Sequence, residues 1–365
     1  MRPWEKNIRQ VVPYVPGEQP AGDKIVKLNT NENPYPPAPG VKKVLEEMEA
    51  DRLRKYPDPT ASILVKELAS YYGLNEDQVF VGVGSDDVLA MSFLTFFNSD
   101  KPVLFPDVTY SFYKVWADLF KVPFETPVLK EDFTIDVKDY EKENGGVIFP
   151  NPNAPTGVYM PLDQVEEILK ANQDVVVIVD EAYVDFAGPS ALELLDKYEN
   201  LLVVQTFSKS RSMAGMRIGF AMGHPDLIRA LNDVKYSYNS YTMNLPSLLA
   251  GVEAVKDKEY FEKTIEKIVA TRERAKKRLT ELGFTFPNSQ SNFIFASHKS
   301  VRRKDFEALK KEQIYVRYFK TPGLDNSLRI SIGTDEEMDT LFRFLEAYYP
   351  MPERKMSEWI NISCV

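Results

Sequence analysis

The chain has 365 residues, 44% of them hydrophobic and 27% charged, which are proportions typical of a globular protein. This length exceeds the roughly 100–200 residues of one domain and favours two lobes. The net charge is −9 and acidic and basic residues are interspersed, so no basic stripe exists and we expect no nucleic-acid partner.

Cysteine and histidine are scarce. The single cysteine, Cys364, leaves no partner for an internal disulfide, and His224 and His298 stand in no recognisable ligand spacing, so we expect no metal. Residues 1–9 contain no apolar signal region, and no apolar run approaches the ~18 residues that span a bilayer. We therefore expect a cytoplasmic protein with no membrane partner.

The first part of the chain is irregular. Residues 1–36 are rich in Pro, Asn and Gly and lack helical periodicity, which predicts an N-terminal arm that we assign to the smaller lobe. Thr60 is predicted to cap a helix that runs to Gly73, because the apolar spacing there fits a one-sided helix.

A regular alternation of strands and helices follows. Short apolar runs end in loops rich in polar residues or glycine, and helical patterns such as 88–97 and 161–172 lie between them. This order predicts βαβ units and a mostly parallel sheet covered by helices on both faces, in a large domain over residues 37–245. The predicted strands are 79–81, 102–105, 146–149, 175–179, 201–205 and 217–222.

The pattern changes after residue 225. Long amphipathic helices are predicted over 226–239 and much of 245–282. Three short strand-like runs follow, and a capping box from Thr334 to Glu337 predicts the start of a final helix. We expect a small C-terminal α+β domain over residues 246–365. Its predicted strands are 293–295, 314–316 and 328–332.

Lys209 lies in the loop directly after the apolar strand 201–205. Ligands of open α/β sheets sit outside the carboxyl ends of the strands, where a partly desolvated lysine can act as a nucleophile toward a carbonyl. Arg217 follows eight residues later and offers a planar cation for a phosphate or carboxylate. Taken alone, each residue is more readily explained as a solvated loop charge.

Residues 82–87 suggest an anion site. Their glycine pair begins like a dinucleotide fingerprint, but the third glycine is missing. The pair would still expose the amides of Ser85 and Asp86 at the start of a helix, where free N–H groups and the helix dipole favour an anion.

Polar side chains follow the other strands as well, and in a parallel sheet they would face one crevice. A lysine, a carboxylate, a phenol, an aromatic ring and a phosphate cradle together suit pyridoxal 5'-phosphate. Lys209 would bind the aldehyde, Asp180 would keep the pyridine nitrogen protonated, Tyr183 would hydrogen-bond the phenolic oxygen and Tyr110 would stack on the ring. The other residues at the predicted strand ends are Asn151, Asn153, Thr206 and Ser208.

These residues stand in motifs that resemble the aspartate-aminotransferase-like, fold type I family of pyridoxal-phosphate enzymes. Within that family, the motifs 29–36 and 56–59 resemble the histidinol-phosphate aminotransferase branch. The resemblance covers nearly the whole chain. The other motifs that carry it are 84–86, 151–157, 179–183, 208–217 and 328–334.

The resemblance implies further roles. Arg329 matches the family's arginine for the carboxylate of glutamate, and Arg317 matches one that holds the substrate phosphate. Tyr14 matches a substrate-gating tyrosine, and Asn29 is assigned with these three to substrate binding. Tyr56 matches a tyrosine that reaches the cofactor phosphate of the neighbouring subunit, so the resemblance implies a homodimer with shared active sites.

Two positions depart from the family pattern. Family members commonly carry Asn directly before Pro-Thr-Gly, where it bonds the phenolic oxygen of the cofactor, whereas this chain has Ala154 there. Either Asn153 takes that role or the bond is lost. The run 210–212 after the lysine is also unusually polar.

We expect transamination of L-histidinol phosphate with 2-oxoglutarate, giving imidazole-acetol phosphate and glutamate. A broad aromatic aminotransferase and a threonine-phosphate decarboxylase are the nearest alternatives, since they would share most of these residues. A non-catalytic cofactor-binding regulator is the alternative outside enzymes. Such a regulator would normally need an added partner-binding or nucleic-acid-binding domain, for which the length and acidic charge leave no room.

Overall fold

A computed structural model describes residues 2–22 and 24–349, and Cys364 lies outside the described residues. Within the described part, the chain forms two compact units, one from residues 2–16, 32–266 and 287–292, the other from 17–31, 267–286 and 293–349. The first unit therefore extends past the predicted division at 245/246. The N-terminal arm, predicted as one piece over 1–36, contributes to both units.

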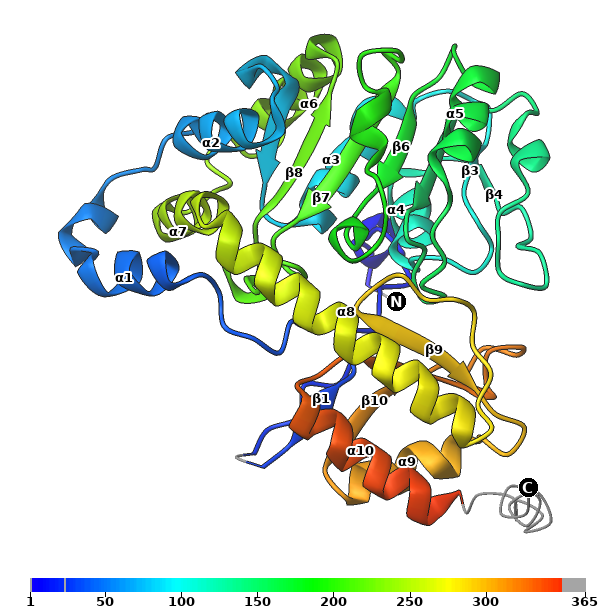
Figure 1. Cartoon of the computed structure of the whole chain (residues 1–365). Coiled ribbons are helices and arrows are strands. Elements are labelled where there is room, and N and C mark those ends of the chain that lie inside the picture. The colour runs from blue at the N-terminus through cyan, green and yellow to red at the C-terminus, as the bar shows by residue number, and fades with distance from the viewer. Residues whose placement is uncertain (1, 23, 350–365) are drawn as a thin grey trace, which may run out of the picture. The chain divides into compact units, whose positions relative to one another are not determined.

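The first unit contains a seven-stranded sheet in the order β2-β8-β7-β6-β5-β3-β4 (Figure 1). β8 is antiparallel to both of its neighbours, and the other pairings are parallel, which confirms the predicted mostly parallel sheet. The strands are β2 Val79–Gly82, β3 Val103–Leu104, β4 Phe124–Glu125, β5 Gly146–Pro150, β6 Val177–Asp180, β7 Leu201–Thr206 and β8 Gly219–Gly223.

Helices cover both faces of this sheet. Ile148 and Ile178 pack in a core with α3 Ser85–Phe96, α4 Phe112–Phe120 and α6 Pro225–Tyr238. Their sequence neighbours Val147 and Val177 point to the opposite face, because side chains alternate along a strand. That second core contains residues of α1 Pro39–Glu47, α2 Ser62–Tyr72, α5 Leu162–Ala171 and α7 Leu245–Lys256.

The second unit is built on a four-stranded sheet in the order β1-β10-β11-β9. β9 Phe293–Ser297, β10 Ile314–Tyr318 and β11 Ser327–Ser331 confirm the three predicted strands. β1 Val26–Leu28, within the predicted arm, pairs in parallel with β10. The long helix α8 Lys258–Glu281 contributes residues to both units, and α9 Arg303–Lys311 and α10 Asp335–Tyr348 belong to the second.

Two predicted helix starts had different outcomes. The capping box is confirmed, since Thr334 Oγ1 accepts from the Glu337 amide at 3.2 Å and Glu337 Oε2 accepts from the Thr334 amide at 2.8 Å. The prediction that Thr60 caps α2 is wrong. Asp58 takes that role, because its carboxylate accepts from the amides of Thr60 and Ser62 at 2.9 and 2.8 Å.

Short 3-10 helices connect several of these elements. They are Glu5–Asn7, Ala50–Arg54, Glu76–Gln78, Val137–Tyr140, Val184–Phe186, Ala191–Leu194 and Ala214–Met216.

None of the helices within 2–22 and 24–349 combines the length and apolar character needed to span a bilayer.

Candidate active site

The strand ends of the large sheet meet at one edge. Gly219, the first residue of β8, pairs with Gly82 at the end of β2 and with Thr206 at the end of β7. Asp180, the last residue of β6, pairs with Pro150 at the end of β5. The loops that carry the predicted cofactor residues therefore leave the sheet at this carboxyl edge.

The start of α3 forms a cradle that only glycine permits. A Cβ added to Gly219 would lie 2.2 Å from both the Gly84 carbonyl carbon and the Ser85 amide nitrogen. Gly84 itself has a φ of 88°, and a Cβ there would lie 2.5 Å from Nη2 of Arg217. Backbone amides, a helix N-terminus and a guanidinium thus approach one another closely, which is the environment that binds a phosphate group.

A chain of polar contacts links five predicted residues beside this cradle. The Tyr110 hydroxyl donates to Asp86 Oδ1 at 2.7 Å, and Asp86 Oδ2 lies 3.3 Å from Nη2 of Arg217. Nη1 of Arg217 lies 3.4 Å from Oγ of Ser208, whose amide donates to Thr206 Oγ1 at 3.1 Å. Residues from four separate segments are therefore held within one hydrogen-bonded group.

Asp180 is a buried carboxylate with a partner that the sequence analysis missed. The hydroxyl of Tyr113, on α4, donates to Asp180 Oδ2 at 2.8 Å, and the Ala182 amide donates to Oδ1 at 3.2 Å. Burial raises the pKa of Asp180 to about 6, although the Tyr113 hydrogen bond and the charge of Lys209 act in the opposite direction. Tyr113 lies on α4, three residues after Tyr110, which precedes the helix.

Lys209 is half-buried, and its Nζ lies 5.7 Å from the centre of the Tyr183 ring. The next residue, Ser210, donates its hydroxyl to Asp185 at 2.5 Å. The guanidinium of Arg211 is buried at 4.2 Å from the Phe261 ring centre and donates to a backbone carbonyl of α7 at 2.8 Å. The unusually polar run after the lysine therefore anchors this loop to the interior.

Glu181, the residue after Asp180, is fully buried. Its carboxylate accepts from Ser190 Oγ at 2.5 Å, from the Ala191 amide at 2.7 Å and from Gln205 Nε2 at 2.9 Å. Burial outweighs these donors and raises the pKa of Glu181 to about 7. Two consecutive carboxyl groups at this edge therefore both lose acidity through burial.

The Asn153 side chain is engaged within its own loop region. Its Oδ1 accepts from Thr109 Oγ1 at 2.9 Å, and its Nδ2 donates to the Val108 carbonyl at 2.9 Å and to Thr156 Oγ1 at 3.2 Å. A role toward the phenolic oxygen of a cofactor would require Nδ2 to share or exchange one of these partners.

Two predicted tyrosines lie outside the hydrogen-bonded group. Tyr14 stacks on Phe112, near Tyr110, with ring centres 4.2 Å apart. Tyr56 is 82% exposed and rests on Tyr241 at 4.7 Å between ring centres. An aromatic side chain so exposed is free to contact another molecule.

The predicted substrate arginines are cross-strand neighbours in the second unit. Arg317 on β10 pairs in register with Arg329 on β11, and both guanidinium groups lie within about 6 Å of the Phe319 ring centre. Nη2 of Arg329 donates to the backbone carbonyl of Asn29 at 3.2 Å, and Asn29 Nδ2 donates to the Glu18 carbonyl at 2.7 Å. Like charges on opposite strand positions repel, and a bound oxyanion at either guanidinium would relieve that repulsion.

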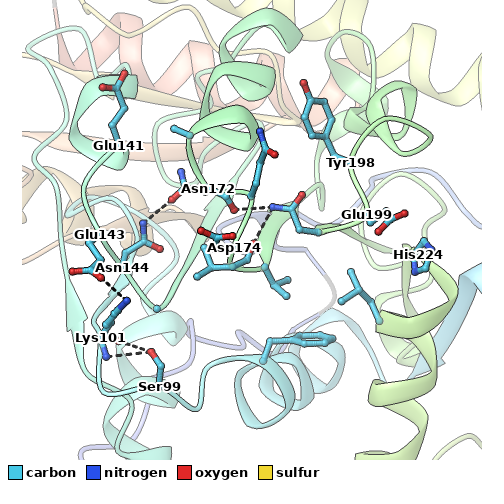
Figure 2. Close-up of a pocket in the computed structure, with 18 of the residues that line it drawn as sticks. Ser99, Lys101, Glu141, Glu143, Asn144, Asn172, Asp174, Tyr198, Glu199 and His224 are labelled. Carbon is cyan, nitrogen blue, oxygen red and sulfur yellow. Dashed lines mark hydrogen bonds and ion pairs between the residues drawn. The ribbon is translucent and has the colours of Figure 1, made fainter.

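A cavity of about 1140 Å³ lies at the other edge of the large sheet, beside the first residues of β5, β6 and β7 (Figure 2). Its polar groups bind one another. Lys101 Nζ lies 2.5 Å from Glu143 Oε1, Asn144 Nδ2 donates to Asn172 Oδ1 at 2.6 Å, and Asn200 Nδ2 donates to the Asn172 carbonyl at 2.9 Å. None of the predicted site residues lines this cavity.

Comparisons with known proteins identify the family that this chain matches. The family model for aminotransferase class I and II matches residues 23–345. Histidinol-phosphate aminotransferases from Brachyspira hyodysenteriae and Clostridium beijerinckii are 53% and 50% identical to this chain. The alignments cover 91% and 94% of this chain and 94% and 96% of those proteins.

Solved structures extend the comparison to the fold. The histidinol-phosphate aminotransferase from Sinorhizobium meliloti in complex with pyridoxal-5'-phosphate superposes with a TM-score of 0.81 at 25% identity, covering 89% of this chain and 91% of that chain. Aspartate aminotransferase from Thermus thermophilus has a TM-score of 0.75 at 20% identity, covering 88% and 91%. The predicted fold class is confirmed.

Proposed function

The chain belongs to the aminotransferase class I and II family, and on that premise we propose that it transfers the amino group of L-histidinol phosphate to 2-oxoglutarate, in histidine biosynthesis. The products are imidazole-acetol phosphate and L-glutamate. The observation that supports this reaction type is the position of the Lys209 amine. It lies beside the Tyr183 ring, and the charge of Lys209 lowers the pKa of the buried Asp180. The substrate is supported by relatives at about 50% identity that carry this activity in their names.

The proposed cofactor is pyridoxal 5'-phosphate, which withdraws electrons from the substrate α-carbon when it is bound. The carboxyl edge fits this group, because glycines at 84 and 219 let the start of α3 approach β8 and the Arg217 guanidinium closely, which brings a helix N-terminus and a cation together. The amides of Ser85 and Asp86 would hold the phosphate together with three further residues. They are Thr206, Ser208 and Arg217.

Four side chains would hold the rest of the cofactor. Asp180 would pair with the pyridine nitrogen, Tyr183 would donate to the phenolic oxygen and Tyr110 would lie against the ring. Lys209 would bind the aldehyde, and its amine, once released by the incoming substrate, would take the proton from the substrate α-carbon. Such a positioned acid–base group contributes on the order of 10²–10⁴ in rate. Asn153 contributes to the phenolic oxygen only if it exchanges a loop partner.

Substrate recognition is assigned to the second unit and to the arm. We assign Arg329 to the carboxylate of glutamate and 2-oxoglutarate, and Arg317 to the phosphate of histidinol phosphate. A guanidinium binds either group through two parallel hydrogen bonds, whereas lysine offers a point charge. Arg317→Lys should therefore raise the KM for histidinol phosphate and leave that for glutamate nearly unchanged. We also assign Asn29 and Tyr14 to substrate binding.

The test is a half-reaction with purified, cofactor-loaded protein. L-histidinol phosphate, phenylalanine, tyrosine and threonine phosphate are compared for the rate at which they bleach the lysine-bound cofactor band near ~420 nm. Rapid conversion by histidinol phosphate alone supports the proposal. Conversion mainly by the aromatic amino acids would indicate an aromatic aminotransferase. Release of CO₂ from threonine phosphate would indicate a decarboxylase. If no amine were converted, the protein would bind the cofactor without catalysing transamination.

We further propose that the enzyme acts as a homodimer in the cytoplasm and that Tyr56 completes the site of its partner. The support is the exposure of the Tyr56 ring, which a second subunit would cover. Mixing Lys209→Ala subunits with Tyr56→Ala subunits tests this. If Tyr56 acts across the interface, each mixed dimer regains one intact site and activity rises above that of either parent; an unchanged sum would contradict the assignment.

A further inference from the structure

Tyr113 is fully buried at the contact between α4 and the carboxyl edge of the sheet. Its ring packs against Phe105 at 5.8 Å and Phe93 at 6.4 Å between ring centres, and its hydroxyl donates to Oδ2 of Asp180. We propose that Tyr113 is a positioning residue that holds Asp180 in one orientation and in its ionised form for the cofactor. This inference rests on the proposed function.

The orientation follows from two separate donors. Tyr113 donates to one carboxylate oxygen at 2.8 Å, and the Ala182 amide donates to the other at 3.2 Å. Because the Tyr113 ring is enclosed by aromatic neighbours, its hydroxyl has little freedom to move. The carboxylate plane is therefore fixed by contacts from α4 and from its own loop before any ligand binds.

The protonation state follows from the charges around Asp180. Burial favours the neutral acid, whereas a hydrogen bond to the charged form favours the carboxylate. The Tyr113 hydroxyl and Lys209 lower the pKa of Asp180, and Asp86 raises it. Tyr113 itself stays protonated, since burial raises its pKa well above the ordinary value. The other titratable groups that face Tyr113 are Tyr110 and Tyr183.

Asp180 can keep the pyridine nitrogen protonated only as a carboxylate. Losing the Tyr113 donor would raise the pKa of Asp180, so a larger fraction would be neutral at a given pH. Cofactor affinity and turnover should then fall on the acid side of the pH profile first. A merely structural role for Tyr113 would lower stability without moving that profile.

The first variant is Tyr113→Phe, which removes the hydroxyl and keeps the ring. We expect cofactor affinity of the apo protein, measured by fluorescence titration from pH 5 to 8, to fall about tenfold near pH 5 and about twofold near pH 7. The midpoint of its acid limb should rise by about one pH unit, the size of one hydrogen bond to a charged group. Tyr140→Phe is the matched control, because that buried hydroxyl has no hydrogen-bond partner among the described residues.

Two further measurements test the same inference if Tyr113→Phe misfolds. Incorporation of 3,5-difluorotyrosine at position 113 keeps the shape and makes the hydroxyl a stronger donor, so the acid limb should move down. In an Asp180→Asn background, Tyr113→Phe should change cofactor affinity by less than about twofold, because it acts only through the carboxylate.

The outcomes separate this inference from the proposed function. Wild-type protein that binds pyridoxal phosphate and completes the half-reaction, with an acid limb that neither change at position 113 moves, would overturn the positioning role alone. Wild-type protein that fails the half-reaction would overturn the proposed function, whereas a shifted binding profile in the variants would still support the Tyr113–Asp180 coupling.

Discussion

The two edges of the large sheet carry similar polar residue types, but these are exposed and ion-paired at one edge and buried at the other. At the amino edge, a cavity of about 1140 Å³ is lined by side chains that bind one another, such as Lys101 with Glu143. At the carboxyl edge, Asp180 and Glu181 are buried, and their pKa values are raised to about 6 and about 7. Glu143 is exposed, and its Lys101 partner lowers its pKa.

This difference shows that the volume of a cavity does not by itself identify the active site. Paired polar groups on an exposed surface need no ligand, because water and neighbouring side chains satisfy them. Buried carboxyl groups near an amine have a state that a ligand can change. Substitutions at matched positions on the two edges should therefore differ in their effects on cofactor binding, turnover and stability.

The largest contrast is expected for the two lysines. Lys209→Ala should abolish the ~420 nm band and slow the amine half-reaction by at least about 10³-fold, because the same amine binds the cofactor and moves the proton. Lys101→Ala, at the cavity edge, removes only an exposed ion pair and should change the rate by less than about twofold. A retained band in Lys209→Ala would refute the lysine assignment.

Two glycines at opposite ends of β8 provide the next contrast. In Gly219→Ala the new methyl group would lie 2.2 Å from backbone atoms of Gly84 and Ser85, so the cradle must move. Because small displacements of a binding loop are costly, we expect cofactor affinity to fall by about 100-fold.

Gly223→Ala is the matched control at the amino edge. Its methyl group would first meet the flexible Leu202 side chain, at 3.0 Å, and affinity should stay within about threefold. Equal losses in both variants, measured by cofactor titration, would mean that the glycines matter for the sheet and not for the cradle.

Much of this contrast was predictable from the sequence, because it depends on local patterns. Continuous apolar runs such as 201–205 identify strands buried on both faces, and the polar residue after each run marks the carboxyl edge. Lys209 and Asp180 were placed in this way. The short strand Val26–Leu28 was missed because three residues carry too little periodicity.

Contacts between distant residues could not be predicted in the same way. The Tyr113–Asp180 hydrogen bond joins residues 67 positions apart, and Ser210 and Asp185 meet through the packing of two loops. A local pattern records which face a residue occupies, but not which side chain from another segment meets it.

Substitution of Asn172, unlike that of Lys209, should lower stability and leave turnover unchanged. Its buried side chain donates to the carbonyls of Tyr140 and Ile168 at 2.9 and 2.8 Å and accepts from Asn144. Asn172→Ala should lower the free energy of unfolding by about 2–3 kcal/mol, measured by urea denaturation, with turnover per folded molecule unchanged. The exposed neighbour variant Gln173→Ala should stay within about 0.5 kcal/mol, and a loss of turnover in Asn172→Ala would break the comparison.

The smallest effect is expected in the pH dependence of stability. The pKa of Glu181 is raised from its ordinary value near 4.5 to about 7 in the folded protein. The folded state therefore binds more protons than the unfolded state between these values. Stability from this group is fully present below about pH 4.5 and is lost as the pH rises through about 7.

Glu181→Gln removes that titration. Its free energy of unfolding should decline less steeply than that of the wild type between pH 4.5 and 7, by up to ~1.4 kcal/mol per pH unit, which is the limit for one proton. Only the slope is diagnostic, because the amide also alters the contact with Gln205. Glu143→Gln, at the exposed amino edge, should leave the steep decline in place. Parallel slopes for wild type and Glu181→Gln would show that burial does not raise the pKa of Glu181 in the folded protein.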